Sequence, residues 1–317
     1  VLCGSKNFPV KEPFVELMKG SLQTFLNAMT FPDKTMYPVA SRNRKDFFNL
    51  MNVYLDAVFY PNISEETFKQ EGWHYELNTP EDKIVYKGVV LNEMKGEFSS
   101  PESCIDRQLA HSLFPSTPYG YESGGDPKCI PDLTYADFKD FHKKHYHPSN
   151  SRLFLYGDGD TQSYLEFLQE KYLQDFERMD VNTSIAHQRS FRKPKRKTLT
   201  YPISSHESLE KKTYVLVGTK LDKAINHEHC LGFSILSHLL LGSSASPLRK
   251  ALITSELGSE VIGGGFDDNR ADTIFAVGLK GTEPEHENKV LALIDSTLLD
   301  LAENGIEEDM VRSAVNS

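Results

Sequence analysis

The residues of this sequence that could serve as metal ligands include two carboxylates one helical turn apart, Glu93 and Glu97. The spacing of apolar residues predicts a helix over 83–98, and Glu93 falls beside Val90 at the border of its apolar stripe. A carboxylate at that border can turn inward, and zinc binds Asp or Glu oxygens. Solvated carboxylates are the commoner case on helices. On these residues alone, both interpretations stay open.

Histidines gather at two places without forming a known metal motif. Imidazole is a favoured zinc ligand, and the sequence has one group at His142, His145 and His147 and a pair at His227 and His229. The pair lies two residues apart on a predicted helix, so its side chains would point to different sides. No His-x-x-Glu-His, His-Glu-x-x-His or Gly-x-Ser-x-Gly occurs in the 317 residues. We therefore assign none of these histidines to a metal.

Composition excludes several classes of protein. The net charge of -10 argues against a nucleic-acid binder and suits basic ligands. No apolar run approaches the roughly 20 residues that cross a bilayer, so no membrane partner is expected. The four cysteines are widely spaced and contain no Cys-x-x-Cys, which indicates reduced structural thiols rather than a disulfide framework or a thiolate zinc site.

The chain divides at a polar, basic segment over 188–197 that contains Pro194 and is typical of a linker. Its basic residues could instead form a nuclear-localisation or nucleic-acid patch, which short motifs of this kind support only weakly. We predict one domain over 1–187 and a second over 198–317. Helical and strand periodicities alternate in both. The fold class predicted is α+β, with two related domains that each pack helices on one face of a mostly antiparallel sheet.

Within this pattern several elements matter for the argument. Helices are predicted over 14–25, 46–59 and 135–145, and an apolar strand over 151–157. The segment 26–39 is predicted to form a hairpin that turns at Pro32. The glycine run at 263–265 lacks the ending of a phosphate loop and lies within a strand pattern, which favours a bend or bulge in a sheet.

Several collinear blocks resemble the presequence protease and falcilysin branch of the pitrilysin (insulinase-like) zinc metallopeptidases. They cover nearly the whole chain in order. The blocks are Gly72-Trp-His-Tyr-Glu-Leu77, Tyr86-Lys-Gly-Val-Val-Leu-Asn-Glu-Met-Lys-Gly96, Tyr119-Gly-Tyr-Glu-Ser-Gly-Gly-Asp-Pro127, His145-Tyr-His-Pro-Ser-Asn150 and Leu239-Leu-Leu-Gly-Ser-Ser-Ala-Ser-Pro-Leu-Arg-Lys250.

The resemblance implies a clam-shaped peptidase of two homologous halves that degrades unstructured peptides, such as cleaved targeting peptides, in an enclosed chamber. Val1 to Ser5 resembles the segment that follows the family's His-x-x-Glu-His helix. We therefore expect this chain to lack the start of domain one and the end of domain two. We also expect it to lack the catalytic base and two zinc ligands, and to be inactive by itself. The carboxy-terminal half of the same parent protein would be its partner.

Residue by residue, the resemblance carries over two sites. It places the distal zinc ligand on Glu93, so Zn²⁺ would be bound in the parent protein and weakly or not at all here. It also matches Asn27, Ala28, Met29 and Thr30 to the edge strand to which the substrate peptide adds. A mitochondrial or plastid location is suggested by the family only. The alternative is a non-catalytic homologue that acts as a peptide-binding or scaffold subunit.

Overall fold

The computed structural model describes residues 1–11 and 13–315, so the last two residues of the predicted second domain lie outside it. The chain forms two compact units. Unit 1 comprises Val1–Glu97 and Ser123–Ser184, and unit 2 comprises Phe98–Glu122 and Ile185–Ser317. The predicted boundary at 187 thus lies close to the passage between the units, but the segment Phe98–Glu122 packs with unit 2. That the units are two related domains stays a prediction.

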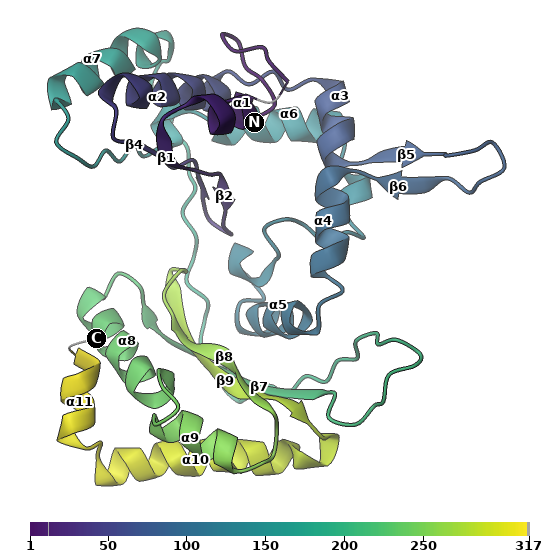
Figure 1. Cartoon of the computed structure of the whole chain (residues 1–317), viewed down its shortest axis with the longest axis vertical. Coiled ribbons are helices and arrows are strands. Elements are labelled where there is room, and N and C mark those ends of the chain that lie inside the picture. Colours follow the sequence, from purple (N-terminus) through teal and green to yellow (C-terminus); the bar gives the residue numbers. More distant parts are fainter. Residues whose placement is uncertain (12, 316–317) are drawn as a thin grey trace. The chain divides into compact units, whose positions relative to one another are not determined.

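Unit 1 combines short antiparallel strand pairs with helices (Figure 1). Its main elements are α1 (Pro13–Gly20), β1 (Gln23–Leu26), β2 (Met29–Thr30), β3 (Thr35–Met36), β4 (Val39–Ser41), α2 (Arg44–Phe59), α3 (Glu65–Thr67), η1 (Phe68–Gly72), β5 (His74–Glu76), β6 (Val85–Lys87), α4 (Val89–Glu97), α6 (Tyr135–His145) and α7 (Thr161–Lys171).

The core of unit 1 forms where α2 packs against α7. The Asn43 side chain caps α2 by accepting a hydrogen bond from the backbone of Asp46. The apolar stripe of α2 then buries Met51, Leu55 and Phe59 against residues of the α7 segment, among them Leu168 and Tyr172. The helices predicted over 46–59 and 135–145 are therefore confirmed as α2 and α6.

The segment from β1 to β4 is a hairpin that turns at 31–34, as the sequence predicts. β1 pairs with β4 and β2 pairs with β3, both antiparallel. Phe31 N donates to Lys34 O at 2.8 Å and closes the turn. The helix predicted over 14–25 is wrong in its second half, because α1 ends at Gly20 and β1 begins at Gln23. Glycine is a weak helix former, and pairing with β4 outweighs the helical spacing there.

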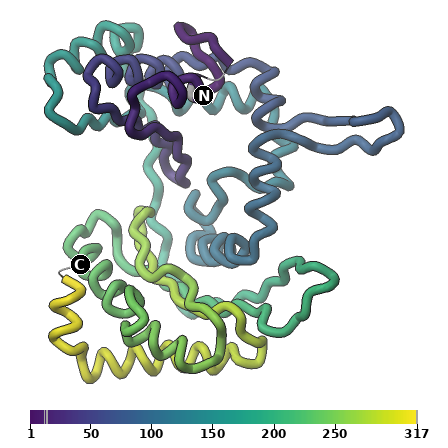
Figure 2. The backbone as a smooth tube through the Cα atoms, viewed as in Figure 1, coloured from purple at the N-terminus to yellow at the C-terminus, as the bar shows by residue number. Residues whose placement is uncertain are grey.

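The helix predicted over 83–98 is wrong at its start. Val85–Lys87 forms β6, which pairs with β5 in an antiparallel hairpin, and α4 begins only at Val89. Figure 2 shows this hairpin projecting as a long ribbon from the rest of unit 1. Tyr86 at the centre of β6 lies directly opposite Tyr75 of β5, and this cross-strand pairing outweighs the helical periodicity.

The apolar strand predicted over 151–157 does not form. The segment adopts no regular structure, and the side chains of Phe154 and Tyr156 are 86% and 93% exposed. A strand needs a neighbour to satisfy its backbone, and no strand of the described residues pairs with this segment.

Unit 2 is built around one antiparallel sheet in the order β7-β9-β8. Its main elements are α5 (Pro101–Leu113), β7 (Thr213–Lys223), α8 (His227–Leu241), α9 (Pro247–Thr254), β8 (Glu260–Asp267), β9 (Asp272–Thr282), α10 (Glu287–Asn304) and α11 (Glu308–Val315).

The sheet of unit 2 is covered on both faces. Residues Val277 and Leu279 of β9 pack with apolar residues of α8, α9 and α10 on one face. The opposite face carries Ile274, which packs with residues of α5 and the loop after it. Gly218 of β7 leaves room for the α5 side chain Leu109. The α+β class is confirmed, with α5 as an additional layer on the second face.

The glycine run forms the predicted bulge. The pairing of β8 with β9 shifts register between Ile262 and Gly265. Gly263, Gly264 and Gly265 all have positive φ, between 71° and 102°. Only glycine adopts such conformations without strain, so this run bends β8 without breaking the sheet.

The segment 188–197 has no regular structure, belongs to unit 2 and is anchored to it at both ends, and its role as a linker stays a prediction. Gln188 is buried, and its N–H donates to the Asp272 carboxylate at 2.9 Å. Arg196 forms a two-pronged ion pair with Glu287 at the start of α10. These contacts hold the segment along unit 2.

Candidate functional site

Helix α4 carries Glu93 on its exposed side. Leu91 and Met94 are the buried residues of this short helix, whereas Glu93 and Glu97 are exposed. Of the two interpretations left open by the sequence, this position agrees with the solvated carboxylate, and the role of Glu93 as a zinc ligand stays a prediction. The side chain faces solvent, where a carboxylate costs least.

Two of the sequence blocks that carry the family resemblance meet at a pair of glycines, Gly72 and Gly88, before the start of this helix. A Cβ at Gly88, directly before α4, would lie 2.0 Å from the carbonyl oxygen of Gly72 and 2.8 Å from Trp73 Cα. Only glycine permits this approach of backbone to backbone. Gly124 similarly packs against the Met94 side chain. Close packing at these glycines therefore fixes the position of α4 and of Glu93 on it.

The residues present do not by themselves make a zinc site. Catalytic zinc is bound by three protein ligands and one open position. Within residues 1–11 and 13–315, no group of three or more His, Cys, Asp or Glu side chains is placed to hold a metal ion. The role of Glu93 as one zinc ligand therefore stays a prediction.

The residues Asn27 to Thr30 lie in the β1–β4 hairpin. Met29 and Thr30 form β2, whereas Asn27 and Ala28 connect it to β1. The carbonyl oxygen of Asn27 accepts a hydrogen bond from Tyr54 of α2 at 3.5 Å. This contact ties the hairpin to the core helix of unit 1. The predicted edge position is consistent with the two-stranded pairing of β2.

The hydrogen bonds of this hairpin determine which backbone groups face away from it. The N–H groups of Asn27 and Phe31 donate to carbonyls of the returning segment at 3.1 and 2.8 Å, and Met29 is paired with Met36. Because residues alternate along an antiparallel strand, Ala28 and Thr30 direct their N–H and C=O groups to the opposite side. The Ala28 N–H donates to the Asn27 side chain at 2.8 Å. The Ala28 carbonyl and both Thr30 groups therefore line the outer edge.

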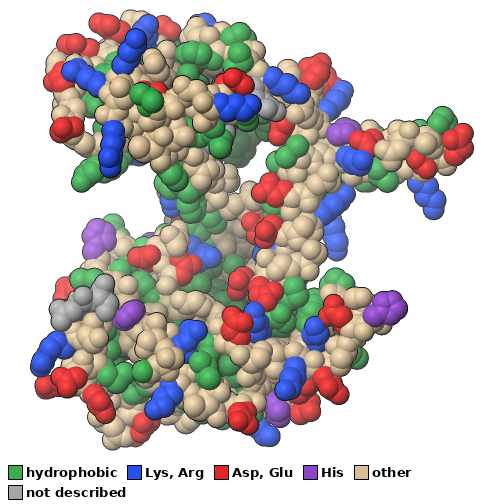
Figure 3. Space-filling view, viewed as in Figure 1, with side chains coloured by type: hydrophobic (Ala, Val, Ile, Leu, Met, Phe, Trp, Pro, Cys, Tyr) green, Lys and Arg blue, Asp and Glu red, His purple; other side chains and the backbone are tan. Residues whose placement is uncertain are grey.

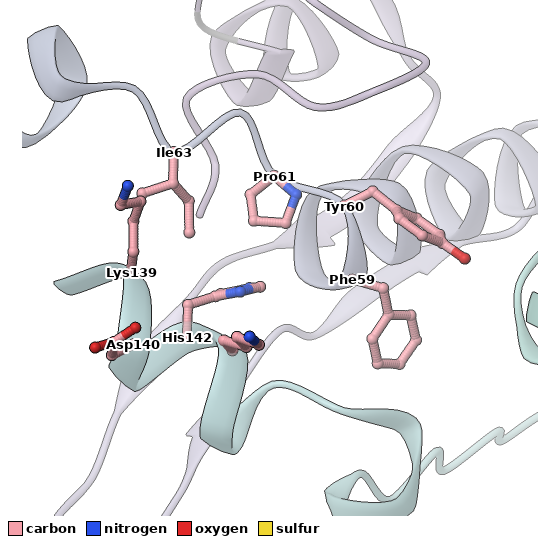
Figure 4. A pocket seen from close by; sticks show the side chains of 8 residues that line it. Phe59, Tyr60, Pro61, Ile63, Lys139, Asp140 and His142 are labelled. Atoms are coloured by element: carbon pink, nitrogen blue, oxygen red, sulfur yellow. The ribbon is translucent and has the colours of Figure 1, made fainter. Parts of the chain in front are cut away.

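A depression of about 470 Å³ in unit 1 contains one histidine of the first group. Figure 4 shows His142 reaching from α6 toward the chain at Pro61. Its Nε2 donates to the Val58 carbonyl at 3.0 Å, and its ring stacks on Tyr146. His142 is thus occupied by a structural hydrogen bond. Burial lowers the pKa of His142, and the bond to the carbonyl opposes this effect.

We expect the stability of unit 1 to fall as the pH drops below about 6.5. The unfolded chain takes up a proton near the ordinary histidine pKa, whereas the folded state, with its lowered pKa for His142, does so only at lower pH. The unfolded state therefore binds more protons in this window, and protonation favours it.

Denaturant unfolding at about pH 7.5 and pH 5.5 measures this loss. His142→Gln should reduce the difference between the two pH values, and the exposed control His206→Gln should leave it unchanged. An equal pH dependence in His142→Gln and the unaltered chain would refute this interpretation.

The second histidine pair also has local partners. His229 Nδ1 lies 2.5 Å from the Asp222 carboxylate, which also accepts a hydrogen bond from Asn226. This arrangement caps the start of α8. The hydrogen bonds from the Lys223 backbone and His229 lower the pKa of Asp222. The role of His229 is therefore structural, at the junction between β7 and α8.

Comparison with known proteins identifies the family. Residues 132–317 match the family described as peptidase M16 inactive domain. This match covers more than half of the chain, which therefore belongs to the M16 peptidase family. The peptidases of this family are zinc metallopeptidases.

Curated relatives match along the whole chain. It is 50% identical over 318 residues to protein HypA of Clostridium perfringens and 49% identical over 322 residues to presequence protease 1 (chloroplastic/mitochondrial) of Arabidopsis thaliana. Each match covers 100% of this chain but 33% and 30% of the relative. The mitochondrial presequence protease of Mus musculus is 39% identical over 321 residues. The chain thus spans about a third of the length of these relatives, and its resemblance to presequence proteases is confirmed.

Solved structures share the fold at low sequence identity. A protease from Helicobacter pylori matches with a TM-score of 0.70 and 18% identity, covering 99% of this chain and 70% of that one. A peptidase M16 inactive domain from Pseudomonas fluorescens matches with a TM-score of 0.67 and 16% identity, covering 92% and 65%. These matches support the α+β fold. Among the described helices, none has the length and apolar character needed to span a bilayer.

Proposed function

We propose that this chain is part of a zinc-dependent endopeptidase that degrades unstructured peptides in an enclosed chamber. The observation that carries the proposal is the 49% identity along the whole chain with presequence protease 1 of Arabidopsis thaliana. In this proposal the chain contributes a peptide-binding edge and one zinc ligand. The remaining zinc ligands and the catalytic base would belong to a His-x-x-Glu-His motif of the parent protein, and the carboxy-terminal half of that protein would be the partner of this chain.

The zinc would activate a water molecule and polarise the scissile carbonyl when bound. This chain's own contribution is to hold the peptide extended. The Ala28 carbonyl and the Thr30 N–H and C=O lie on the outer edge of β2, so an added strand would bond to backbone groups. Backbone recognition tolerates varied sequences, as a degradative peptidase requires. The adaptable side chain of Met29 suits the same purpose.

Replacing Thr30 tests the peptide edge. In the complete protein, Thr30→Pro removes the outward N–H and should raise KM for an unstructured peptide about fivefold, the loss of roughly one hydrogen bond. Proline is tolerated on strand edges where its missing N–H faces outward. The matched control Thr30→Val keeps the N–H and should behave like the unaltered protein. Equal KM values for both variants would refute a peptide at this edge.

The second candidate is a non-catalytic homologue that binds peptides or serves as a scaffold. It is favoured by the exposure of Glu93, which belongs to no group of three or more possible metal ligands among the described residues. Turnover decides between the two, because a scaffold would bind the peptide without cleaving it. An organellar location is part of the first proposal and is supported by the names of the eukaryotic relatives. The relative from the bacterium Clostridium perfringens gives this location no support.

A further inference from the structure

The hairpin β5–β6 has two chemically different faces. His74, Glu76 and Lys87 lie on one face, where Lys87 and Glu76 form an ion pair. Tyr75 and Tyr86 are directly paired across the strands and lie on the other face. Side chains alternate between faces along a strand, and this register therefore separates a charged face from an aromatic one.

The aromatic face is a compact cluster of three rings. The centroids of Trp73 and Tyr75 are 5.4 Å apart, those of Trp73 and Tyr86 are 5.8 Å apart, and those of the two tyrosines are 5.2 Å apart. The indole Nε1 donates to the Leu133 carbonyl at 2.9 Å and fixes the orientation of Trp73. We call these three residues the aromatic cluster.

The aromatic cluster is exposed although its residues are large. Tyr75 is 63% exposed and Tyr86 is 44% exposed. The apolar side chains of Leu77 and Ile84 are also exposed on the hairpin. The side chain of Leu133, whose carbonyl accepts the hydrogen bond from Trp73, is exposed too. A run of exposed apolar and aromatic side chains marks an interaction surface.

Carboxylates and ammonium groups both lie around the aromatic cluster, since Lys83 follows the turn of the hairpin and Lys95 Nζ donates to the Tyr86 carbonyl at 3.1 Å. Asp132 precedes Leu133 and interacts with the Tyr86 hydroxyl, while Glu81 and Asp82 lie at the turn of the hairpin. Figure 3 shows acidic side chains at the free end of this projecting hairpin. The side-chain hydrogen bond to Tyr75 is the main cause that raises the pKa of Tyr86. The faces of aromatic rings carry partial negative charge, and these rings lie near carboxylates.

We propose that the aromatic cluster of hairpin β5–β6 binds arginine or lysine side chains of an unstructured basic peptide. Guanidinium and ammonium groups stack on Trp and Tyr faces, and nearby carboxylates add electrostatic attraction. The net charge of -10 favours the same ligands. This inference rests on the proposed function and deepens it, because it adds basic side chains to the backbone recognition at β2. Targeting peptides for mitochondria and chloroplasts are arginine-rich and poor in acidic residues.

The single tryptophan of the chain makes the proposal directly testable, because Trp73 is the only indole that can report binding. The probe is a tryptophan-free peptide of about 20 residues with several arginines and no carboxylates. The control peptide replaces each arginine by neutral citrulline. Titration of the 317-residue chain should change Trp73 emission to saturation with the arginine peptide only, and added salt should weaken the effect.

Substitutions of single tyrosines test whether the peptide contacts the aromatic cluster. Tyr75→Ser should weaken binding about fivefold, as expected for the loss of one cation–π contact at an exposed site. The matched control Tyr156→Ser removes a tyrosine that is 93% exposed in the same unit and should leave the affinity unchanged. Circular dichroism confirms that both variants are folded.

Three outcomes would overturn the proposal. Equal responses to the arginine and citrulline peptides would show that charge plays no part. A rise in the anisotropy of labelled peptide without a change in Trp73 emission would place the peptide elsewhere, and would leave the peptide edge at β2 intact. A Trp73 emission that changes with protein concentration alone would identify a second copy of this chain as the occupant.

Discussion

Gly88→Ala is expected to destabilise unit 1 by about 3 kcal/mol, the upper end of the usual cost of overpacking. The added Cβ would lie 2.0 Å from the Gly72 carbonyl oxygen and 2.8 Å from Trp73 Cα, both of which are backbone atoms. Backbone cannot move aside as a flexible side chain does, so η1 and α4 must separate. Thermal unfolding followed by Trp73 fluorescence should show a midpoint lowered by roughly 10 °C.

Gly96→Ala is the matched control in the same helix. A Cβ at Gly96 meets no atom within 4 Å, and alanine is a better helix former than glycine by about 0.5–1 kcal/mol. This variant should therefore be as stable as the unaltered chain or slightly more so. If Gly88→Ala unfolds at the same temperature as Gly96→Ala, the close packing at Gly72 does not hold α4 in place.

Glu93→Gln is expected to lower peptide hydrolysis by the complete protein by more than about 100-fold. Altering groups that only support a metal ligand costs about 10–100-fold, and loss of a direct ligand should cost more. The substitution keeps size and polarity but removes the charge that zinc requires. Because Glu93 is exposed in this chain, the change should leave folding intact. Activity is measured with an unstructured peptide at saturating zinc.

Glu97→Gln controls for the loss of a carboxylate on this helix. Glu97 lies one turn further along α4 and is also exposed, but the family resemblance gives it no role. Its replacement should reduce hydrolysis less than twofold, within the small effects typical of surface substitutions. Equal losses in the two variants would mean that the helix contributes only a general negative potential.

The sequence predicts the helices of this chain better than its strands. Periodicity locates α2 and α6 because their apolar stripes are long and their ends are capped, by Asn43 and Thr134. The hairpin at 26–39 follows from its turn residues. By contrast, 83–98 contains a helical spacing over its whole length, and the strand at its start depends on pairing with His74–Glu76. A periodicity within one segment does not show whether another segment will pair with it.

The sequence predicts only part of the candidate site, because the rest of it depends on how the strands pair. The resemblance points to Glu93 and to the hairpin segment containing Thr30, and both can be located on the structure. The aromatic cluster was missed, although Trp73, Tyr75 and Leu77 alternate along the sequence as residues on one strand face do. Its third ring, Tyr86, is brought to the cluster only by the register of β6. That register comes from tertiary structure.

Zinc analysis of the complete protein, with Glu93→Gln and Glu97→Gln purified alongside it, shows directly whether Glu93 binds the metal. The claim is that this chain contributes Glu93 as one zinc ligand of an M16 peptidase. It predicts about one zinc per molecule in the unaltered protein and in Glu97→Gln, and a much lower content in Glu93→Gln. Full zinc occupancy in Glu93→Gln, or none in the unaltered protein, would contradict it.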